Sequence, residues 1–286
     1  MRLVLAARST ASLETVAEEC RAKGAQALVV PTDVSVDEQV VALRDAAVER
    51  YGRIDVWVGA ASVFSYGAFE DTPAEVFRHQ IEANLMGQVS SARAVLPVFR
   101  SQGSGVLVFV ASIYSRVTSP YASGYVTSKF GLLGFAESLG QELKGSGISV
   151  CSVLPATIDT PIYQHAANFT GQRIHPIPPI VGPDRVARAI VRVSSSPRRS
   201  VVVGRTQASL IALHELLPAV YHRTVRPAMH LVAMRKGEVE PNPGNVFEPG
   251  TATNAVTGGW RWPAAVRLAP FAVLAAVAGA ALRRRR

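Results

Sequence analysis

Short apolar runs rich in β-branched residues alternate along this 286-residue chain with longer segments of helical periodicity. Strands are predicted at Arg2–Ala7, Ala27–Val30, Ile54–Val58, Val106–Ala111, Ile148–Leu154 and Val201–Val203, and helices at Ser12–Lys23, Asp37–Tyr51, Ala74–Arg100, Tyr121–Lys144 and Asp184–Ser194. Strands separated by helices of this length form crossover units, which build a parallel sheet covered on both faces. The expected fold class is therefore α/β, with a doubly wound, mostly parallel sheet and a ligand site beyond the carboxyl ends of its strands.

The periodicity changes after Gly204, and this change defines the expected domain organisation. Residues 1–204 are predicted to form the α/β domain and residues 205–236 a helical extension, interrupted near Pro218 and Pro227. Residues 237–259 are rich in Pro, Gly, Asn and Thr and are predicted to be an irregular linker. Residues 260–286 form an apolar tail with a basic end.

Charge and cysteine content narrow the function classes. The net charge is +9, but four positive charges are the terminal Arg283–Arg286 and the others are scattered, so no nucleic-acid partner is expected. Only Cys20 and Cys151 are present, which favours a reducing compartment over a disulfide framework. The start lacks the apolar region of a signal peptide. A cytoplasmic location is expected, and no metal site is predicted.

The tail is a candidate membrane segment. Leu268–Leu282 is 15 residues without a charge, against the ~20 that a spanning helix needs. Trp260 and Trp262 at one end and the arginines at the other suit interfacial anchoring. A membrane-associated tail, a tilted or shortened spanning helix and a soluble tail all stay open.

Tyr125 and Lys129 lie four residues apart at the start of a long helical segment, so both side chains project from one helix face. A nearby ammonium group favours phenolate and is expected to lower the tyrosine pKa from its reference of about 10. The strand Val106–Ala111 delivers Ser112 at its carboxyl end, where a hydroxyl can donate a hydrogen bond to a substrate carbonyl. The three residues together predict an acid/base site.

These residues occur in order with Thr32-Asp33-Val34, Asp55-Val56-Trp57-Val58, Asn84-Leu85-Met86-Gly87, and Pro155 with Thr160. In this order and spacing, residues 2–204 resemble the short-chain dehydrogenase/reductase family. The resemblance implies a Rossmann-like fold, a nicotinamide cofactor, and interconversion of a carbonyl and a secondary alcohol.

The resemblance also implies a role for each matching residue. Tyr125 would be the acid/base, Ser112 would polarise the carbonyl, Lys129 would hold the nicotinamide ribose, and Asn84 would hold a water in a proton relay. Asp33 and Val34 would meet the adenine, and Pro155 and Thr160 the carboxamide side. Arg8 follows the first visible strand, where an arginine accommodates a 2′-phosphate and an acid would bind the ribose hydroxyl. NADP(H) is therefore expected in preference to NAD(H), with a solvent-facing Arg8 as the alternative.

The chain departs from the family at two places. Family members begin with a strand and a Thr-Gly-x-x-x-Gly-x-Gly turn, which this sequence lacks. The absent strand would lie between Arg2–Ala7 and Ile54–Val58, so we expect Met1 to be an internal residue with about 30 residues upstream, enough for one strand, turn and helix. Gly59-Ala60-Ala61-Ser62 also stands where the family has Asn-Asn-Ala-Gly.

The leading hypothesis is an NADP(H)-dependent oxidoreductase, in a homo-oligomer, that acts on an apolar small molecule. The segment Pro161–Val181, rich in Ile, Pro, Phe and Tyr, is expected to cover that substrate. The alternative is a non-catalytic, membrane-associated binding or scaffold protein. NADPH binding separates the two, because only the enzyme requires it.

Overall fold

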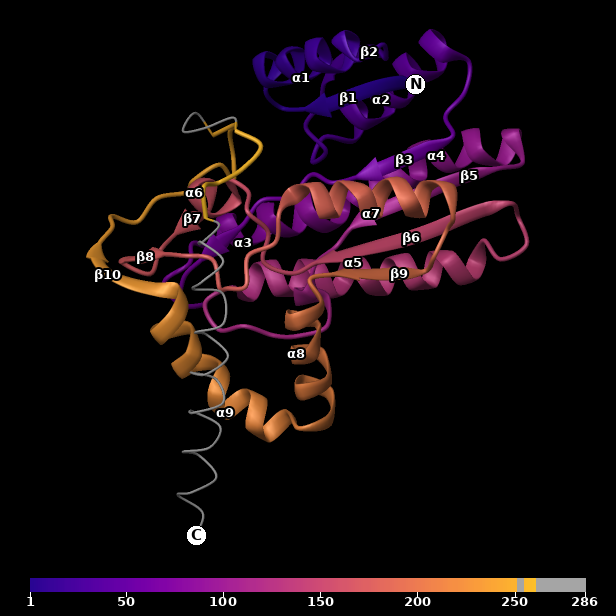
Figure 1. The fold of residues 1–286 in the computed structure, drawn as a ribbon. Helices are drawn as coiled ribbons and strands as arrows, with labels where there is room; N and C mark the ends of the chain where they lie inside the picture. Colours follow the sequence, from indigo (N-terminus) through magenta and orange to yellow (C-terminus); the bar gives the residue numbers. More distant parts are fainter. Residues whose placement is uncertain (251–254, 261–286) are drawn as a thin grey trace.

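The structure, a computed structural model, describes residues 1–250 and 255–260. At its centre is a parallel sheet of four strands, β3 (Val56–Gly59), β5 (Gly105–Val110), β6 (Ile148–Pro155) and β9 (Ser200–Val203), in the order β3-β5-β6-β9. Helices cover both faces of this sheet (Figure 1). The expected doubly wound, Rossmann-like α/β fold is confirmed.

The first two strands form a separate parallel pair. β1 (Arg2–Ala7) pairs with β2 (Gln26–Pro31), and in the described parts of the chain neither of them joins the four-stranded sheet. Among the described residues, β3 likewise has only β5 as a neighbour, and Val58 of β3 is 41% exposed. The sheet is thus divided between β1 and β3, where the sequence predicted an interruption.

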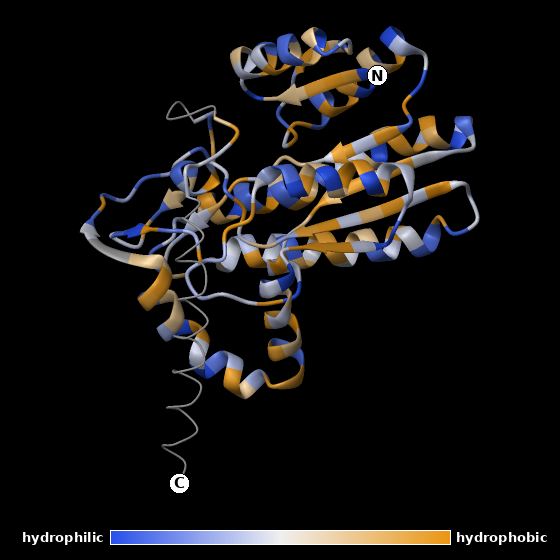
Figure 2. Ribbon diagram, viewed as in Figure 1, coloured by the Kyte–Doolittle hydropathy of each residue, from blue (hydrophilic) through white to orange (hydrophobic). Residues whose placement is uncertain are grey.

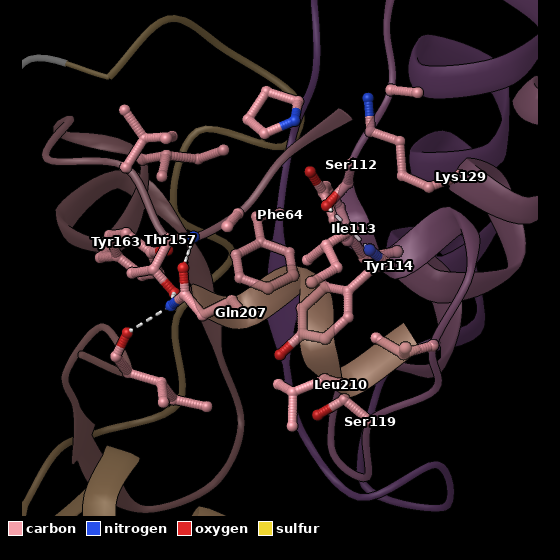
Figure 3. A pocket seen from close by; sticks show the side chains of 18 of the residues that line it. Phe64, Ser112, Ile113, Tyr114, Ser119, Lys129, Thr157, Tyr163, Gln207 and Leu210 are labelled. Atoms are coloured by element: carbon pink, nitrogen blue, oxygen red, sulfur yellow. Dashed lines mark hydrogen bonds between the residues drawn. The ribbon is translucent and has the colours of Figure 1, made fainter. Parts of the chain in front are cut away.

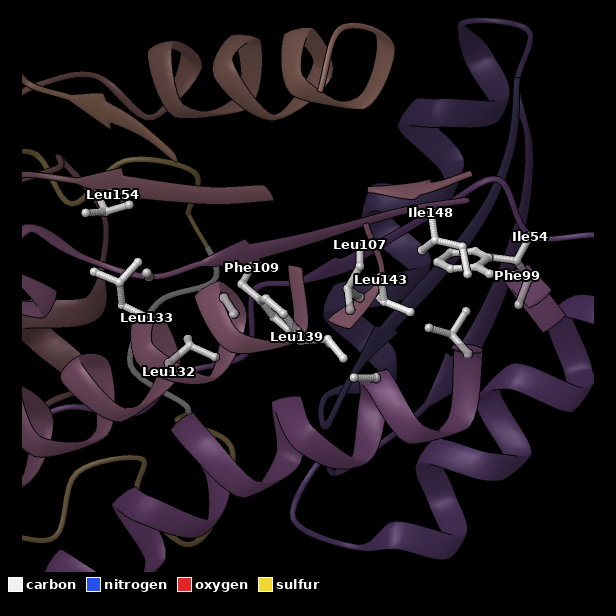
Figure 4. Packing of buried hydrophobic residues seen from close by; sticks show 14 of the residues in the cluster. Ile54, Phe99, Leu107, Phe109, Leu132, Leu133, Leu139, Leu143, Ile148 and Leu154 are labelled. Carbon is white, nitrogen blue, oxygen red and sulfur yellow. The ribbon is translucent and has the colours of Figure 1, made fainter. Parts of the chain in front are cut away.

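Alternation along the strands explains how the sheet is covered. Successive side chains point to opposite faces, so Leu107 and Phe109 of β5 pack on one face and Val108 on the other. The first face meets α4 (Gly87–Gln102) and α5 (Ser123–Glu142) in the largest core cluster (Figure 4). The second face meets α7 (Pro183–Ser195). Because both faces are buried, the strands are almost continuously hydrophobic (Figure 2).

The helices of the first half lie close to their predicted positions. α1 spans Thr10–Ala22 and α2 spans Asp37–Tyr51. The single helix predicted over Ala74–Arg100 consists of α3 (Ala74–Ile81), a π-helical turn at Glu82–Met86, and then α4. Such turns insert one extra residue and recur at functional sites. Asn84 lies in the middle of this turn.

Beyond β9 the chain forms α8 (Arg205–Leu216), α9 (Pro218–Ala228) and a π-helical turn at Met229–Ala233. The strand β10 (Met234–Glu238) follows and pairs antiparallel with β8 (Gln172–Ile174). The remaining short elements are β4 (Ser65–Tyr66), a 3-10 turn at Ile113–Ser115, α6 (Ile162–His165) and β7 (Ala167–Asn168).

The segment after β10, predicted to be an irregular linker, packs back on the α/β domain. Val246 is fully buried in a cluster with Val63 and Val76. The Asn245 amide donates a hydrogen bond to the His165 carbonyl at 2.8 Å. The sequence did not reveal this docking, because the contact is made by one short apolar pair, Val246 and Phe247, among turn-forming residues.

Within residues 1–250 and 255–260, no helix combines the length and the apolar character needed to cross a membrane. The tail predicted as a membrane segment lies, from residue 261 onward, outside the described residues.

Candidate active site

Ser112 lies at the carboxyl end of β5, as predicted. Its hydroxyl oxygen accepts a hydrogen bond from the Tyr114 amide at 3.1 Å and so caps the 3-10 turn that follows. The oxygen is occupied as an acceptor, so the hydroxyl proton is directed elsewhere. Ser112 lines the central cavity, where this proton is available to a ligand.

Tyr125 and Lys129 lie one turn apart in the first half of α5. The Tyr125 side chain is 8% exposed and Lys129 is 1% exposed. The Lys129 ammonium donates a hydrogen bond to the Val110 carbonyl at 3.1 Å and lies 5.5 Å from the centre of the Tyr125 ring. An ammonium group has three donors, so Lys129 retains capacity for ligand hydroxyl groups.

The pKa values of this pair differ from the expectation. Burial raises the pKa of Tyr125 to about 12, although the Ser112 and Ser62 hydroxyls act in the opposite direction. Burial also lowers the pKa of Lys129 to about 7. The expected lowering of the tyrosine pKa by a charged lysine is wrong for this structure. The physical reason is that desolvation of both groups outweighs their mutual attraction.

A cavity of about 510 Å³ contains Ser112, Tyr125 and Lys129 in its wall. Most of its lining is aromatic or aliphatic, and the Phe64 ring packs edge-on against Tyr125 at 4.2 Å between centroids. Figure 3 shows Phe64 between Tyr163 on one side and Tyr114 on the other. The site is therefore a small set of polar groups at an apolar chamber.

Helices α8 and α9 supply much of the remaining wall. Leu210 and Leu213 from α8, and Val225 from α9, line the cavity. Gln207, at the start of α8, donates a hydrogen bond to the Thr157 hydroxyl at 2.8 Å and so ties α8 to the end of β6 (Figure 3). The extension after residue 204 is thus part of the site.

The residues predicted to bind the cofactor fall into two groups. Pro155 and Thr160 line the same cavity as Tyr125 and Lys129. Arg8, Asp33 and Val34 lie instead at the ends of β1 and β2 and are not among the described residues of the cavity wall. The structure thus brings together the residues predicted for the nicotinamide side and places those predicted for the adenine side apart from them.

Asp33 has the surroundings of an ionised carboxylate. It accepts hydrogen bonds from the Ser35 amide at 2.9 Å and the Ser35 hydroxyl at 2.6 Å. Burial acts to raise the pKa of Asp33, but these hydrogen bonds and the charges of Arg8 and His79 outweigh it, so that the pKa is lowered. Val34 is in contact range of Gly87, where an added Cβ would collide with the Val34 carbonyl.

Arg8 is not the free, solvent-facing arginine of the alternative reading. Its guanidinium donates hydrogen bonds to the carbonyl oxygens of Asn245, at 2.6 Å, and Val246, at 3.2 Å. The segment after β10 therefore contacts Arg8, the residue predicted to bind a 2′-phosphate.

Asn84 is fully buried and holds the backbone of the loop after β3. Its side chain accepts a hydrogen bond from the Val63 amide at 2.7 Å and donates to the Val63 carbonyl at 2.9 Å and to the Ser128 hydroxyl at 3.2 Å. Asn84 is not one of the described residues lining the cavity. Its side chain acts here on the loop, while its predicted role toward a water stays a prediction.

Gln80 and Gln88 extend this arrangement by one helical turn in each direction. The Gln80 amide donates to the Val63 carbonyl at 3.2 Å, and the Gln88 amide donates to the Ala61 carbonyl at 3.2 Å. Gln80, Asn84 and Gln88 form an amide ladder of four-residue spacing along one helix face. Sequence analysis missed both glutamines, although that spacing was a detectable signal. The ladder supports the loop that lacks the family's asparagine pair.

A Rossmann-like sheet with Ser112 after the carboxyl end of β5, and with Tyr125 and Lys129 beside it on α5, defines a dinucleotide-type α/β protein. A family model described as short chain dehydrogenase matches residues 1–170. The chain belongs to the short-chain dehydrogenase/reductase family.

Individual relatives agree with this assignment. The chain is 30% identical to the uncharacterized oxidoreductase YxnA of Bacillus subtilis over 233 residues, which cover 80% of this chain and 65% of that relative. It thus spans slightly less than two thirds of YxnA. It is also 30% identical to sepiapterin reductase of Chlorobaculum tepidum over 200 residues, covering 70% of this chain and 80% of that protein.

A solved structure is similar as well. An alcohol dehydrogenase from the archaeon Thermococcus sibiricus, complexed with 5-hydroxy-NADP, superposes with a TM-score of 0.62 at 25% identity. The match covers 71% of this chain and 85% of that one.

Proposed function

We propose that this chain is an NADP(H)-dependent oxidoreductase that interconverts a carbonyl and a secondary alcohol on an apolar small molecule. The observation that carries the proposal is the placement of Ser112, Tyr125 and Lys129 in the wall of one apolar cavity. The cofactor supplies and accepts the hydride when bound. The residues of the chain bind and orient the substrate and the cofactor, and they move the proton.

Tyr125 transfers the proton at the substrate oxygen. In reduction its phenol protonates the developing alkoxide, and in oxidation its phenolate removes the alcohol proton. Ser112 donates its free hydroxyl proton to the same oxygen as negative charge develops. The raised pKa of Tyr125 favours the protonated form needed for reduction.

Lys129 fits the nicotinamide side of a cofactor. Its ammonium is buried beside Tyr125 and has one hydrogen bond among the described residues, to Val110, so that further donors can meet ribose hydroxyl groups. A charged ammonium at this point also stabilises the phenolate. Pro155 and Thr160, in the same wall, would meet the carboxamide.

Arg8 supports NADP(H) rather than NAD(H). Its guanidinium faces backbone carbonyl oxygens of Asn245 and Val246, which are weaker partners than a phosphate dianion. Asp33 is close enough for the Arg8 charge to lower its pKa, so the two lie on one side of the proposed adenosine site. The related alcohol dehydrogenase was solved with an NADP derivative, which is in line with this preference.

The proposed substrate is apolar because the cavity is. Phe64, Ile177, Leu210 and Val225 line it, and a buried polar substrate group would find few partners there. Residues of Pro161–Val181 contribute Ile162, Tyr163 and Ile177, as expected for the segment that covers the substrate.

The test is turnover of a panel of apolar ketones, followed by NADPH absorbance, in the wild type and Tyr125→Phe. Removal of the acid/base hydroxyl should lower kcat by about 100-fold or more. Tyr51→Phe, which loses only a hydroxyl that is bonded to the Leu3 carbonyl and does not line the cavity, is the matched control and should retain activity. Retained turnover in Tyr125→Phe, with circular dichroism unchanged, would refute the mechanism.

A further inference from the structure

Ser62 places a third hydroxyl group at the active site. Its Oγ atom is buried and has no hydrogen-bond partner among the described residues, yet the residue lines the cavity together with Ser112 and Tyr125. Buried hydroxyls in native proteins almost always have a partner, since burial without one removes the hydrogen bonds that water would supply. A buried hydroxyl without a partner in the wall of a candidate active site therefore indicates that its hydrogen bond forms when the site is working.

The position of this hydroxyl is held by its neighbours in the sequence. On one side the Ala61 carbonyl accepts a hydrogen bond from Gln88, and on the other the Val63 amide and carbonyl are both bonded to Asn84. Hydrogen bonds to the amide ladder therefore hold the backbone on both sides of Ser62. A hydroxyl on a backbone held in this way is preorganised, because its position is set before any ligand binds.

We propose that Ser62 is a positioning residue that donates a hydrogen bond to the phenolic oxygen of Tyr125 and stabilises the phenolate, while the Ser112 hydroxyl proton is directed to the substrate oxygen. The inference rests on the proposed function, in which Tyr125 changes protonation state. The Ser62 hydroxyl keeps its proton throughout, so the step is a hydrogen bond and not a proton transfer.

The electrostatics of Tyr125 agree with this arrangement. Burial raises its pKa, and the nearby Ser112 and Ser62 hydroxyls act against the rise. The titratable groups that face Tyr125 are Lys129 on α5, Tyr66 on β4, Tyr114 on the 3-10 turn and Tyr163 on α6. None of these groups is altered when Ser62 is substituted, so a shift in the pKa of Tyr125 can be assigned to loss of the Ser62 hydroxyl.

The first experiment is the pH profile of kcat/KM in the wild type, Ser62→Ala, Ser62→Gly and Ser62→Thr. Loss of a donor to the phenolate raises the pKa of Tyr125, so the profile of Ser62→Ala should move by about one unit to higher pH. Alcohol oxidation on the rising limb should fall about ten-fold. Ser62→Gly should behave like Ser62→Ala, and Ser62→Thr, which keeps a hydroxyl, should restore the wild-type profile.

Ser115→Ala is the matched control. Ser115 is also a buried serine whose hydroxyl has no hydrogen-bond partner in the described part of the chain, but it is not among the described residues of the cavity wall. Its removal should leave the profile in place. A profile of Ser62→Ala that coincides with the wild type, or an equal shift in Ser115→Ala, would overturn the proposal.

The second experiment does not depend on turnover. In protein labelled with [13Cζ]tyrosine, the Tyr125 resonance is assigned by its absence in Tyr125→Phe and compared between variants at one pH. The hydrogen bond to the phenolic oxygen should make this resonance move in Ser62→Ala and stay in Ser115→Ala. A stationary resonance contradicts the role of Ser62. Absence of turnover on every substrate would instead contradict the proposed function, while the resonance still decides the hydrogen bond.

Discussion

The Arg8 guanidinium donates a hydrogen bond to the carbonyl oxygen of Asn245, 2.6 Å away and 237 residues later in the chain. This contact joins the end of β1 to the segment after β10. This hydrogen bond occupies the Arg8 guanidinium, which we propose as the partner of the cofactor 2′-phosphate. The segment after β10 and NADP(H) would therefore contact the same side chain.

Arg8→Ala should therefore change cofactor preference. A hydrogen bond to a charged group contributes about 1.5–3 kcal/mol, so the Kd for NADPH should rise at least about ten-fold. The Kd for NADH, which has no 2′-phosphate, should change much less. Fluorescence titration with each cofactor measures both values. Arg2→Ala on the same strand is the control, and an equal loss for the two cofactors would contradict the assignment.

Lys129 makes stability depend on pH. Its pKa is about 7 in the folded protein and its ordinary value is 10.5, so between these values the unfolded chain binds a proton that the folded chain does not. The free energy of unfolding should therefore rise with pH across this window, by up to about 1.4 kcal/mol per unit. Below pH 7 both states are protonated and this contribution is flat.

Lys129→Met should remove this part of the slope and raise stability at pH 7, because no ammonium then has to be desolvated. Urea unfolding at pH 7 and pH 9 measures the difference. Lys144→Met, at an exposed lysine, provides the reference for loss of a surface charge. Equal slopes in the wild type and Lys129→Met would show that the buried ammonium does not carry the effect.

Gly59 and Gln88 should be energetically coupled. A Cβ atom at Gly59 would overlap the Gln88 amide oxygen, and Gln88 is buried. We expect Gly59→Ala to lower the free energy of unfolding by about 1–3 kcal/mol. In a Gln88→Ala background the same substitution should cost less, and a double-mutant cycle in urea measures the coupling.

Gly134→Ala is the control for that cycle. An added Cβ there meets nothing within 4 Å, and the residue lies inside α5, where alanine is favoured over glycine by up to about 1 kcal/mol. It should be neutral or stabilising. Additive effects of Gly59→Ala and Gln88→Ala would rule out the predicted coupling.

Leu210 should limit the length of the substrate. It lines the cavity from α8 opposite the polar groups, as Figure 3 shows for Leu210 and Ser112. Leu210→Trp reduces the volume, so KM should rise about ten-fold for long apolar ketones and change little for short ones. Steady-state kinetics over a series of chain lengths tests this. Leu216→Trp, at a leucine that is 77% exposed on the same helix, should show no length dependence.

Much of the α/β fold was predictable because its signals are local. The boundaries of α2 and the start of β6 agree with the sequence-based expectation, since strand and helix periodicities are written in consecutive residues. The positions of Ser112, Tyr125 and Lys129 were predictable for the same reason, as each follows directly from the end of a strand or the first turns of a helix.

The relationships that decide how the site works were not predictable, because they join residues far apart in the chain. The Arg8–Asn245 contact spans 237 residues, and the cavity wall combines β5, α5, α8 and α9. The direction of the pKa shifts depended on burial, which only packing determines.

The sequence by itself therefore determined the order of the elements and the placement of Ser112, Tyr125 and Lys129 on them, because both are encoded over a few neighbouring positions. Tertiary structure alone decided that Ser62 lines one cavity with Ser112 and Tyr125, that an amide ladder supports its loop, and that the segment after β10 reaches Arg8. Those outcomes depend on long-range packing, in which the partners of a polar group are chosen by the whole fold.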